Sequence, residues 1–126
     1  MKPIKLKIKT KSQEYPIIIG SNLISNIAKI TFYNSIKFKK CLLVIDKNIS
    51  KNTISRIKKS LMKKDVFIYF FNANEVNKNL NTINKILDIL LNKNFSREDC
   101  LISIGGGITG DISGFAASLF KRGLKF

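Results

Sequence analysis

The sequence predicts an α/β fold with a parallel sheet, and three observations support this prediction. Two continuous apolar runs, at 40–45 and 66–71, have the length and composition of strands that are buried on both faces. Amphipathic helical segments follow each run, an order that is typical of parallel sheets covered by helices. A glycine-rich segment at 105–107 then joins a third strand to a helix, the kind of junction at which parallel sheets bind ligands.

A small β-hairpin is expected before this sheet. Residues 4–8 alternate apolar side chains with lysine, the period-two pattern of a half-exposed strand. A second β-rich run at 15–19 ends in the turn-forming sequence Gly-Ser-Asn. Ser21 or Asn22 in that turn is predicted to cap a short helix that continues to Ile27. We therefore expect a Rossmann-like parallel-sheet domain with a small N-terminal β-hairpin.

Three strand–helix pairs make up the rest of the prediction. Strands are expected at 40–45, 66–71 and 100–104, and helices at 48–64, 80–91 and 108–120. In the helix at 80–91, leucine and isoleucine recur at i, i+3, i+4 and i+7 steps. Ser96 and Asp99 have the spacing of a helix capping box, but a strand follows them, so we predict a polar turn. Residues 124–126 resemble the start of a further strand, so we expect residues 1–126 to be an incomplete domain.

The strong positive charge has two interpretations. The chain has 23 Lys and Arg residues against 8 Asp and Glu residues, a formal net charge of +15. This charge favours nucleic-acid binding, because lysine neutralises phosphates and releases counterions. However, only Arg56, Arg97 and Arg122 are arginine, the better residue for phosphates and base edges, and no long basic run marks a binding arm. We predict compositional bias and no nucleic-acid partner, with a basic nucleic-acid-binding module as an alternative.

Cysteine and histidine usage argues against a metal site within this sequence. Cys41 and Cys100 lie far apart in apolar runs, and the sequence has no histidine. The usual zinc patterns are therefore excluded, and we predict two reduced, buried thiols. The N-terminal residues lack the apolar segment of a signal peptide, and no apolar run approaches the roughly 20 residues that span a membrane. We expect a cytoplasmic protein without a membrane partner.

The segment 104–111, Ile-Gly-Gly-Gly-Ile-Thr-Gly-Asp, carries the most functional information. Glycines without Cβ atoms let a phosphate approach the backbone, and the N–H groups of the following helix then point at the anion. Gly105, Gly107 and Gly110 match the G-x-G-x-x-G pattern. They follow a late strand, and the acidic residue expected about 20 positions later would lie beyond Phe126, so this is not an ordinary Rossmann fingerprint. The alternative is a glycine turn that serves only a tight strand–helix junction.

Residues 105–123 closely resemble the signature G-G-G-V-x-G-D-x-x-G-F-A-A-x-x-x-x-R-G of 3-dehydroquinate synthases, with Ile108 in place of valine. The whole chain aligns with the N-terminal third of that family. The resemblance implies conversion of 3-deoxy-D-arabino-heptulosonate 7-phosphate to 3-dehydroquinate and phosphate in the shikimate pathway, which leads to chorismate and aromatic amino acids. It also implies bound NAD and a divalent metal, zinc or cobalt.

The resemblance assigns the candidate cofactor contacts by position. It matches an Asp-x-Asn strand end that holds the adenosine ribose, a Glu-x-x-Lys loop near the ribose, the glycine turn at the pyrophosphate, and an Asp on the nicotinamide side. The residues implied to contact NAD are Asp46, Asn48, Glu75, Lys78, Gly106, Gly107, Ile108 and Asp111.

Most of these side chains also have an ordinary structural interpretation. Asp46 and Asn48 suit a turn at a strand end, and Glu75 and Lys78 suit a solvated loop before a helix. Asp111, which we expect in the first turn of its helix, suits the positive end of the helix dipole.

Two further positions concern the loop and the substrate. Asn74 stands where the family has a loop glycine, and we expect it to keep the turn because asparagine tolerates positive φ. Arg122 matches an arginine that, in this family, reaches the substrate phosphate from the neighbouring subunit, which implies a homodimer. Its alternative role is that of a basic residue at a helix C-terminus.

The resemblance places the metal ligands, a glutamate and two histidines, beyond residue 126. We therefore expect residues 1–126 to be an NAD-binding N-terminal domain without the metal and substrate domain, without catalytic residues and without activity alone. Another sugar-phosphate cyclase, such as a 2-deoxy-scyllo-inosose or valiolone synthase, is an alternative. A relative of glycerol or iron-dependent alcohol dehydrogenases is a further one, although these lack the G-F-A-A-x-x-x-x-R-G sequence.

Overall fold

Strand β3 (Lys40–Asp46) is the middle strand of a three-stranded parallel sheet in the computed structural model, which describes residues 2–126. It pairs with β4 (Asp65–Phe71) on one side and with β5 (Cys100–Ile104) on the other. The helices that follow these strands are α2 (Lys51–Ser60), α3 (Leu80–Asn92) and α4 (Gly107–Leu119). The predicted alternation of three strands with three helices is therefore confirmed.

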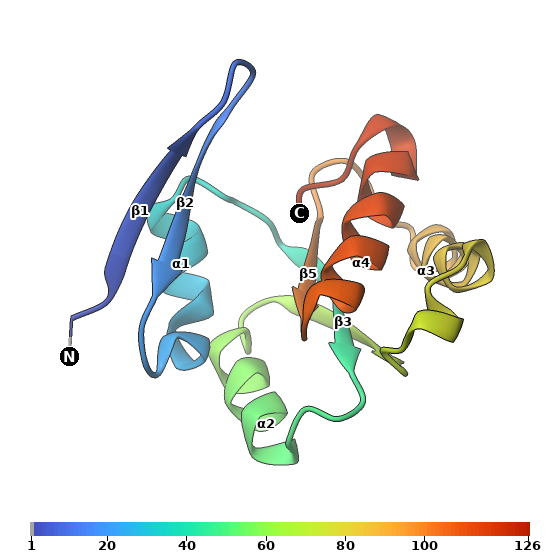
Figure 1. The fold of residues 1–126 in the computed structure, drawn as a ribbon, viewed down its shortest axis with the longest axis horizontal. Coiled ribbons are helices and arrows are strands. Elements are labelled where there is room, and N and C mark those ends of the chain that lie inside the picture. Colours follow the sequence, from blue (N-terminus) through green and yellow to red (C-terminus); the bar gives the residue numbers. More distant parts are fainter. Residues whose placement is uncertain (1) are drawn as a thin grey trace.

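The N-terminal segment forms the predicted hairpin. Strands β1 (Ile4–Lys9) and β2 (Glu14–Ile19) pair antiparallel, with Ile4 opposite Ile19, and a helix α1 (Ile27–Tyr33) follows. The hairpin lies outside the main sheet and beside α1 (Figure 1). One of its faces is apolar and exposed; it consists of Ile4, Leu6, Tyr15, Ile17 and Ile19.

The two faces of the main sheet are covered by different helices (Figure 1). Leu42 and Val44 of β3 belong to the cluster formed with α3 and α4, whereas Cys41, Leu43 and Ile45 belong to the cluster formed with α1 and α2. None of these five side chains exposes any surface. Because successive strand residues point to opposite faces, a strand between two helical layers must be apolar throughout. This is why the run at 40–45 does not alternate.

The two cysteines lie opposite each other in the parallel register of β3 and β5. Both are free and buried, as predicted. Burial raises the pKa of the Cys41 thiol to about 11 and that of the Cys100 thiol to about 12. Both side chains therefore stay protonated near neutral pH and pack as small apolar groups.

Two helix starts differ from the prediction. Asn22 holds the predicted N-cap position, but its side chain makes no capping hydrogen bond; it has φ 59°, and its Oδ1 accepts a hydrogen bond of 2.9 Å from Arg56 Nη2. The helical segment begins with a 3₁₀ turn, η1 (Leu23–Asn26), and continues through α1 beyond Ile27. Helix α2 is shorter than 48–64, because Ser50 caps it by accepting from the Thr53 N–H at 3.2 Å.

The chain end and the turn before β5 agree with expectation. Lys125 forms a parallel bridge with Cys100, and its carbonyl accepts from the Leu101 N–H at 2.8 Å, so this segment begins to pair beside β5. Asp99 Oδ2 accepts from the Ser96 N–H at 2.7 Å, which makes the predicted polar turn. Among residues 2–126, the helices lack the length and apolar character that crossing a membrane requires.

The apolar face of α3 is narrower than its sequence pattern suggests. Ile83, Ile86 and Leu90 are buried, whereas Leu80 and Leu91 are exposed. The reason is that α3 packs against the sheet and α4 along one stripe, while the two leucines lie on its flanks.

Replacing Ile86 with alanine should therefore destabilise the protein far more than the matched change at Leu91. Ile86 exposes no surface and Leu91 exposes 58%. Loss of buried methylene groups leaves a cavity, so Ile86→Ala should lower the free energy of unfolding by about 2–4 kcal/mol. Leu91→Ala should lower it by less than about 0.5 kcal/mol. Urea unfolding followed by circular dichroism measures both values, and equal losses would contradict this packing.

Candidate functional site

The three consecutive glycines after β5 have different surroundings. Gly105 has φ +155°, and a Cβ placed on it would lie 2.7 Å from Thr109 Oγ1 and 3.1 Å from Asp46 Cβ. Packing within the chain thus requires glycine at this position. A Cβ on Gly106 or Gly107 would meet no atom within 4 Å. The space over these two residues is open rather than filled by side chains, so a ligand can approach their backbone.

The N-terminus of α4 faces this open turn. Its N-cap residue, Gly106, is extended, and no side chain caps the helix. By helix geometry, the first N–H groups of α4 have no acceptor within the helix. Gly110 is the first residue to donate back, to the Gly106 carbonyl at 3.1 Å. Free N–H groups and the helix dipole together favour an anion, such as a diphosphate.

Asp46 lies beside the glycine turn because β3 and β5 are neighbours and end at the same edge. Its Cβ is 3.1 Å from the position of a Cβ on Gly105, and its Oδ1 accepts from the Asn48 N–H at 3.0 Å. Asp46 thus makes the strand-end turn, and its second carboxylate oxygen has no protein donor among residues 2–126. Asn48 lies in the same loop and is exposed. The structure brings both predicted residues to the edge that carries the glycine turn.

The loop after β4 keeps its turn without positive φ. Asn74 has φ −145° and ψ 167°, so our expectation of a left-handed residue is wrong. Instead, its Oδ1 accepts from the Asn77 N–H at 2.8 Å and caps a 3₁₀ turn, η2 (Glu75–Asn77). Glycine cannot cap in this way, so Asn74 supplies an interaction in place of conformational freedom. Glu75 is exposed in this loop.

Lys78 and Asp111 contact each other. Lys78 Nζ lies 3.0 Å from Asp111 Oδ2, and both side chains are partly exposed. The hydrogen bond and the charge of Asp111 raise the pKa of Lys78 above its usual value. Asp111 is the fifth residue of α4, which begins at Gly107, so our placement of it in the first turn is wrong. The ion pair, rather than the helix dipole, is its principal interaction in this structure.

Arg122 is not near these residues. It is exposed in η3 (Phe120–Arg122), at the opposite end of α4 from the glycine turn. A helix of 13 residues is about 20 Å long, which is too far for a side chain to reach back. Ile108, by contrast, is half-buried in the first turn of α4, beside the glycines. Within one chain, the structure groups the predicted cofactor contacts and leaves Arg122 apart from them.

Thr109 is a residue that the sequence pattern did not single out. It is fully buried, and its hydroxyl lies under Gly105 without a hydrogen-bond partner among residues 2–126. It occupies the variable position of the signature, so the signature itself does not indicate this contact. Thr109 and Asp46 together restrict position 105 to glycine.

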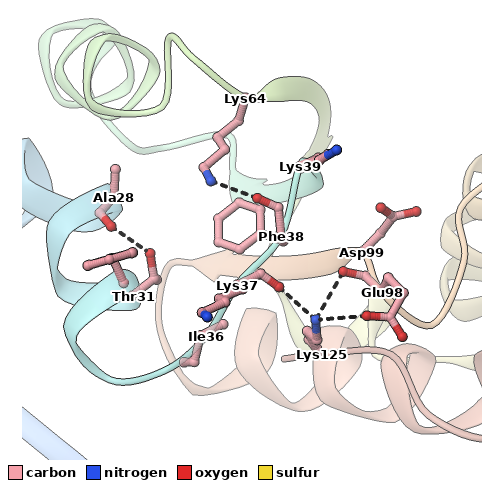
Figure 2. Close-up of a pocket in the computed structure, with 11 residues that line it drawn as sticks. Ala28, Thr31, Ile36, Lys37, Phe38, Lys39, Lys64, Glu98, Asp99 and Lys125 are labelled. Carbon is pink, nitrogen blue, oxygen red and sulfur yellow. Dashed lines mark hydrogen bonds and ion pairs between the residues drawn. The ribbon is translucent and has the colours of Figure 1, made fainter.

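A cavity of about 600 Å³ lies beyond the amino ends of the strands, at the opposite end of the sheet from the glycine turn (Figure 2). Two lysines on its wall are already bonded to the backbone. Lys64 Nζ donates to the Phe38 carbonyl at 2.7 Å, and Lys125 Nζ donates to the Lys37 carbonyl at 2.6 Å. Parallel sheets bind ligands beyond the carboxyl ends of their strands, and this cavity lies at the amino ends. No group of three or more Cys, Asp or Glu side chains within 2–126 could hold a metal ion.

The arrangement is that of the α/β fold found in sugar-phosphate cyclases. It resembles a 2-deoxy-scyllo-inosose synthase solved with carbaglucose-6-phosphate, NAD⁺ and Co²⁺, with a TM-score of 0.82 at 19% identity over 96% of this chain and 33% of that one. It also resembles a 2-epi-5-epi-valiolone synthase from Streptomyces hygroscopicus solved with NAD⁺ and Zn²⁺, with a TM-score of 0.70 at 24% identity over 93% of this chain and 32% of that one. The fold class is therefore the one predicted.

Sequence comparisons narrow this class to one family. Residues 68–126 match the family model described as 3-dehydroquinate synthase N-terminal. The 3-dehydroquinate synthase of Pelagibacter ubique is 63% identical over 123 residues, which cover 98% of this chain and 33% of that protein. The chain matches the N-terminal third of 3-dehydroquinate synthases. It spans about one third of the length of the curated relatives that it matches.

Alanine should be tolerated at Gly106 and not at Gly105. The Gly105 change combines a strained φ with a Cβ 2.7 Å from Thr109 Oγ1, so the free energy of unfolding should fall by about 2–3 kcal/mol. Gly106 has an ordinary extended φ and open space, so its variant should lose less than about 1 kcal/mol. Urea unfolding of the two variants gives the comparison. A larger loss for Gly106→Ala would show that the open turn is not the resting conformation.

Proposed function

We propose that this chain is the NAD-binding part of a 3-dehydroquinate synthase. The observation that carries the proposal is the open backbone of Gly106 and Gly107 at the N-terminus of α4, with the Asp46 carboxylate beside it. An uncapped helix N-terminus over two glycines suits a diphosphate, and a strand-end carboxylate suits ribose hydroxyls. The NAD⁺ in two solved structures of the same fold supports this cofactor class.

In this proposal each residue has a definite task. The backbone N–H groups at Gly106, Gly107 and Ile108 bind the pyrophosphate. The Asp46 carboxylate accepts from the hydroxyls of the adenosine ribose, and Asn48 donates to them. Glu75 and Lys78 form the wall of the site on the side of β4. Asp111 lies toward the nicotinamide. When bound, NAD supplies a reversible hydride transfer, and the protein contributes its position and its electrostatic surroundings.

The activity of the whole protein is also a proposal. We infer that it eliminates phosphate from 3-deoxy-D-arabino-heptulosonate 7-phosphate and closes the ring to 3-dehydroquinate, as a carbon–oxygen lyase of the shikimate pathway in the cytoplasm. The 63% identity to a 3-dehydroquinate synthase supports this substrate. Residues 2–126 offer no cluster that fits the divalent metal, so its ligands would come from the metal and substrate domain. Arg122, remote from the cofactor turn, would serve the substrate phosphate of the other subunit in a homodimer.

Two alternatives rest on weaker observations. The fold is shared with 2-deoxy-scyllo-inosose and valiolone synthases, but identities of 19% and 24% support the fold alone. A nucleic-acid role would need free basic side chains in an ordered patch. Several lysines instead bond to backbone carbonyls, including Lys40, Lys64, Lys121 and Lys125.

Calorimetric titration tests the cofactor site. We expect NAD⁺ to bind the 126-residue chain weakly, and Gly106→Ala to weaken binding at least about tenfold, because its methyl group would occupy the space needed by the diphosphate. Lys29→Ala, an exposed change on α1, should leave the affinity within about twofold. Equal affinity for NAD⁺ in the wild type and in Gly106→Ala would contradict the site. Salt-sensitive DNA binding without NAD⁺ binding would favour the alternative.

The chain alone should form no 3-dehydroquinate. It lacks histidine, and no group of three or more Cys, Asp or Glu side chains among residues 2–126 fits a metal ion, so we expect the metal that polarises the substrate to be held elsewhere in the whole protein. An assay of phosphate release with the sugar phosphate, NAD⁺ and Co²⁺ should give the uncatalysed rate. Turnover by the purified chain would contradict the proposal that metal and substrate binding reside outside residues 1–126.

A further inference from the structure

The ion pair between Lys78 and Asp111 joins two parts of the chain that are 33 residues apart. Lys78 ends the 3₁₀ turn after β4, whereas Asp111 lies on the helix after β5. These two strands are not neighbours, because β3 separates them. The ion pair therefore connects the loop of one outer strand to the helix of the other, at the edge of the sheet that carries the glycine turn.

The loop at 72–79 has no other polar connection of this kind among residues 2–126. Its remaining side-chain hydrogen bonds are local and join residues no more than five positions apart. Val76, in the middle of the loop, is 82% exposed and so provides little packing. Local bonds give the loop its shape, but they do not set its position relative to α4. Ala73 packs at the start of the loop against the core cluster that includes α4. Toward its end, the Lys78–Asp111 contact is the side-chain hydrogen bond that joins the loop to α4 among residues 2–126.

We propose that Lys78 and Asp111 act as one positioning unit, a tie that holds the loop after β4 against α4 and so sets the position of Glu75 relative to the glycine turn. This inference rests on the proposed NAD site. It differs from two independent contacts with the cofactor, because each residue here works through the other. In this proposal Lys78 acts through its bond to Asp111, so a lysine without that partner would not hold the loop against α4.

The surroundings of the pair support this role. The two charged side chains lie on the rim of a groove of about 340 Å³ between α3 and α4, whose other walls are mainly apolar: Leu80, Ile83, Ile112 and Phe115. The remaining wall residue, Asn79, is polar, but its side chain already donates to the Val76 carbonyl and accepts from the Thr82 N–H. Glu75 is the other acidic group whose charge acts on Lys78, and Asp111 is the one that bonds to it.

A set of variants separates a tie from two independent contacts. Lys78→Met and Asp111→Asn each remove one charge, the double variant removes both, and Lys78→Asp with Asp111→Lys exchanges them. We expect each single change to weaken NAD⁺ binding about fivefold, in the range of an exposed ion pair. The double variant should also lose about fivefold rather than about 25-fold, because the two changes remove the same interaction. The exchanged pair should regain part of the affinity that each single variant loses, because it restores the ion pair but reverses the two charges that face the cofactor.

Hydrogen exchange supplies a readout that needs no ligand. The Asn77 N–H, bonded to Asn74 Oδ1 at 2.8 Å, reports on the loop. Its exchange should accelerate in both single variants and return to the wild-type rate in the exchanged pair. Glu98→Gln, which removes the pair between Glu98 and Lys125 on another part of the surface, is the matched control and should change neither exchange at Asn77 nor NAD⁺ affinity.

The outcomes distinguish this inference from the proposed function. Unchanged exchange at Asn77 in the single variants, or multiplied losses of affinity without rescue by the exchanged pair, would overturn the tie. A wild-type chain that fails to bind NAD⁺, while exchange at Asn77 follows the expected pattern, would overturn the cofactor site and leave the tie standing. Recovery of both NAD⁺ affinity and slow exchange at Asn77 in the exchanged pair would support the tie and the cofactor site together.

Discussion

The packing of β3 between two helical layers is the constraint on which the rest of this structure depends. Its five fully buried residues alternate between the α1–α2 side and the α3–α4 side. Burial of this kind favours one register of β3, because a one-residue shift would exchange the side chains that pack on the two faces. The parallel register then brings the ends of all three strands to one edge, and Asp46 arrives beside the glycines as a consequence.

At that end of the sheet, the three consecutive glycines at 105–107 do not share one physical role. Gly105 is needed for packing, since Thr109 and Asp46 occupy the space that a side chain would take. A Cβ on Gly106 or Gly107 would meet nothing within 4 Å, so no contact within the chain requires glycine there, and the proposed diphosphate site would account for it. The turn is thus closely packed at Gly105 and has an open backbone at Gly106 and Gly107. A strand–helix junction without a ligand would need glycine only at the packed position, Gly105.

Local patterns predicted some features of this site well and others poorly. The turn at 96–99, the strand ends and the apolar run of β3 follow from interactions within a few residues, and they agree with the structure. Asn22, Asn74 and Asp111 were assigned roles from general preferences, for capping, positive φ and the helix dipole. Each instead adopts a role set by a partner, and for Asn22 and Asp111 this partner, Arg56 or Lys78, is remote in sequence. No periodicity in the sequence could indicate those pairings.

The sequence by itself determined the α/β class, the order of the elements and the glycine turn, because periodicity and glycine spacing are local properties of the backbone. It also indicated the resemblance to 3-dehydroquinate synthases through the signature at 105–123. Tertiary structure decided which of the matched residues share a location. It grouped the residues after β3, β4 and β5 and placed Arg122 a helix length away. Proximity of this kind depends on strand order and helix length, which emerge only when the layers pack.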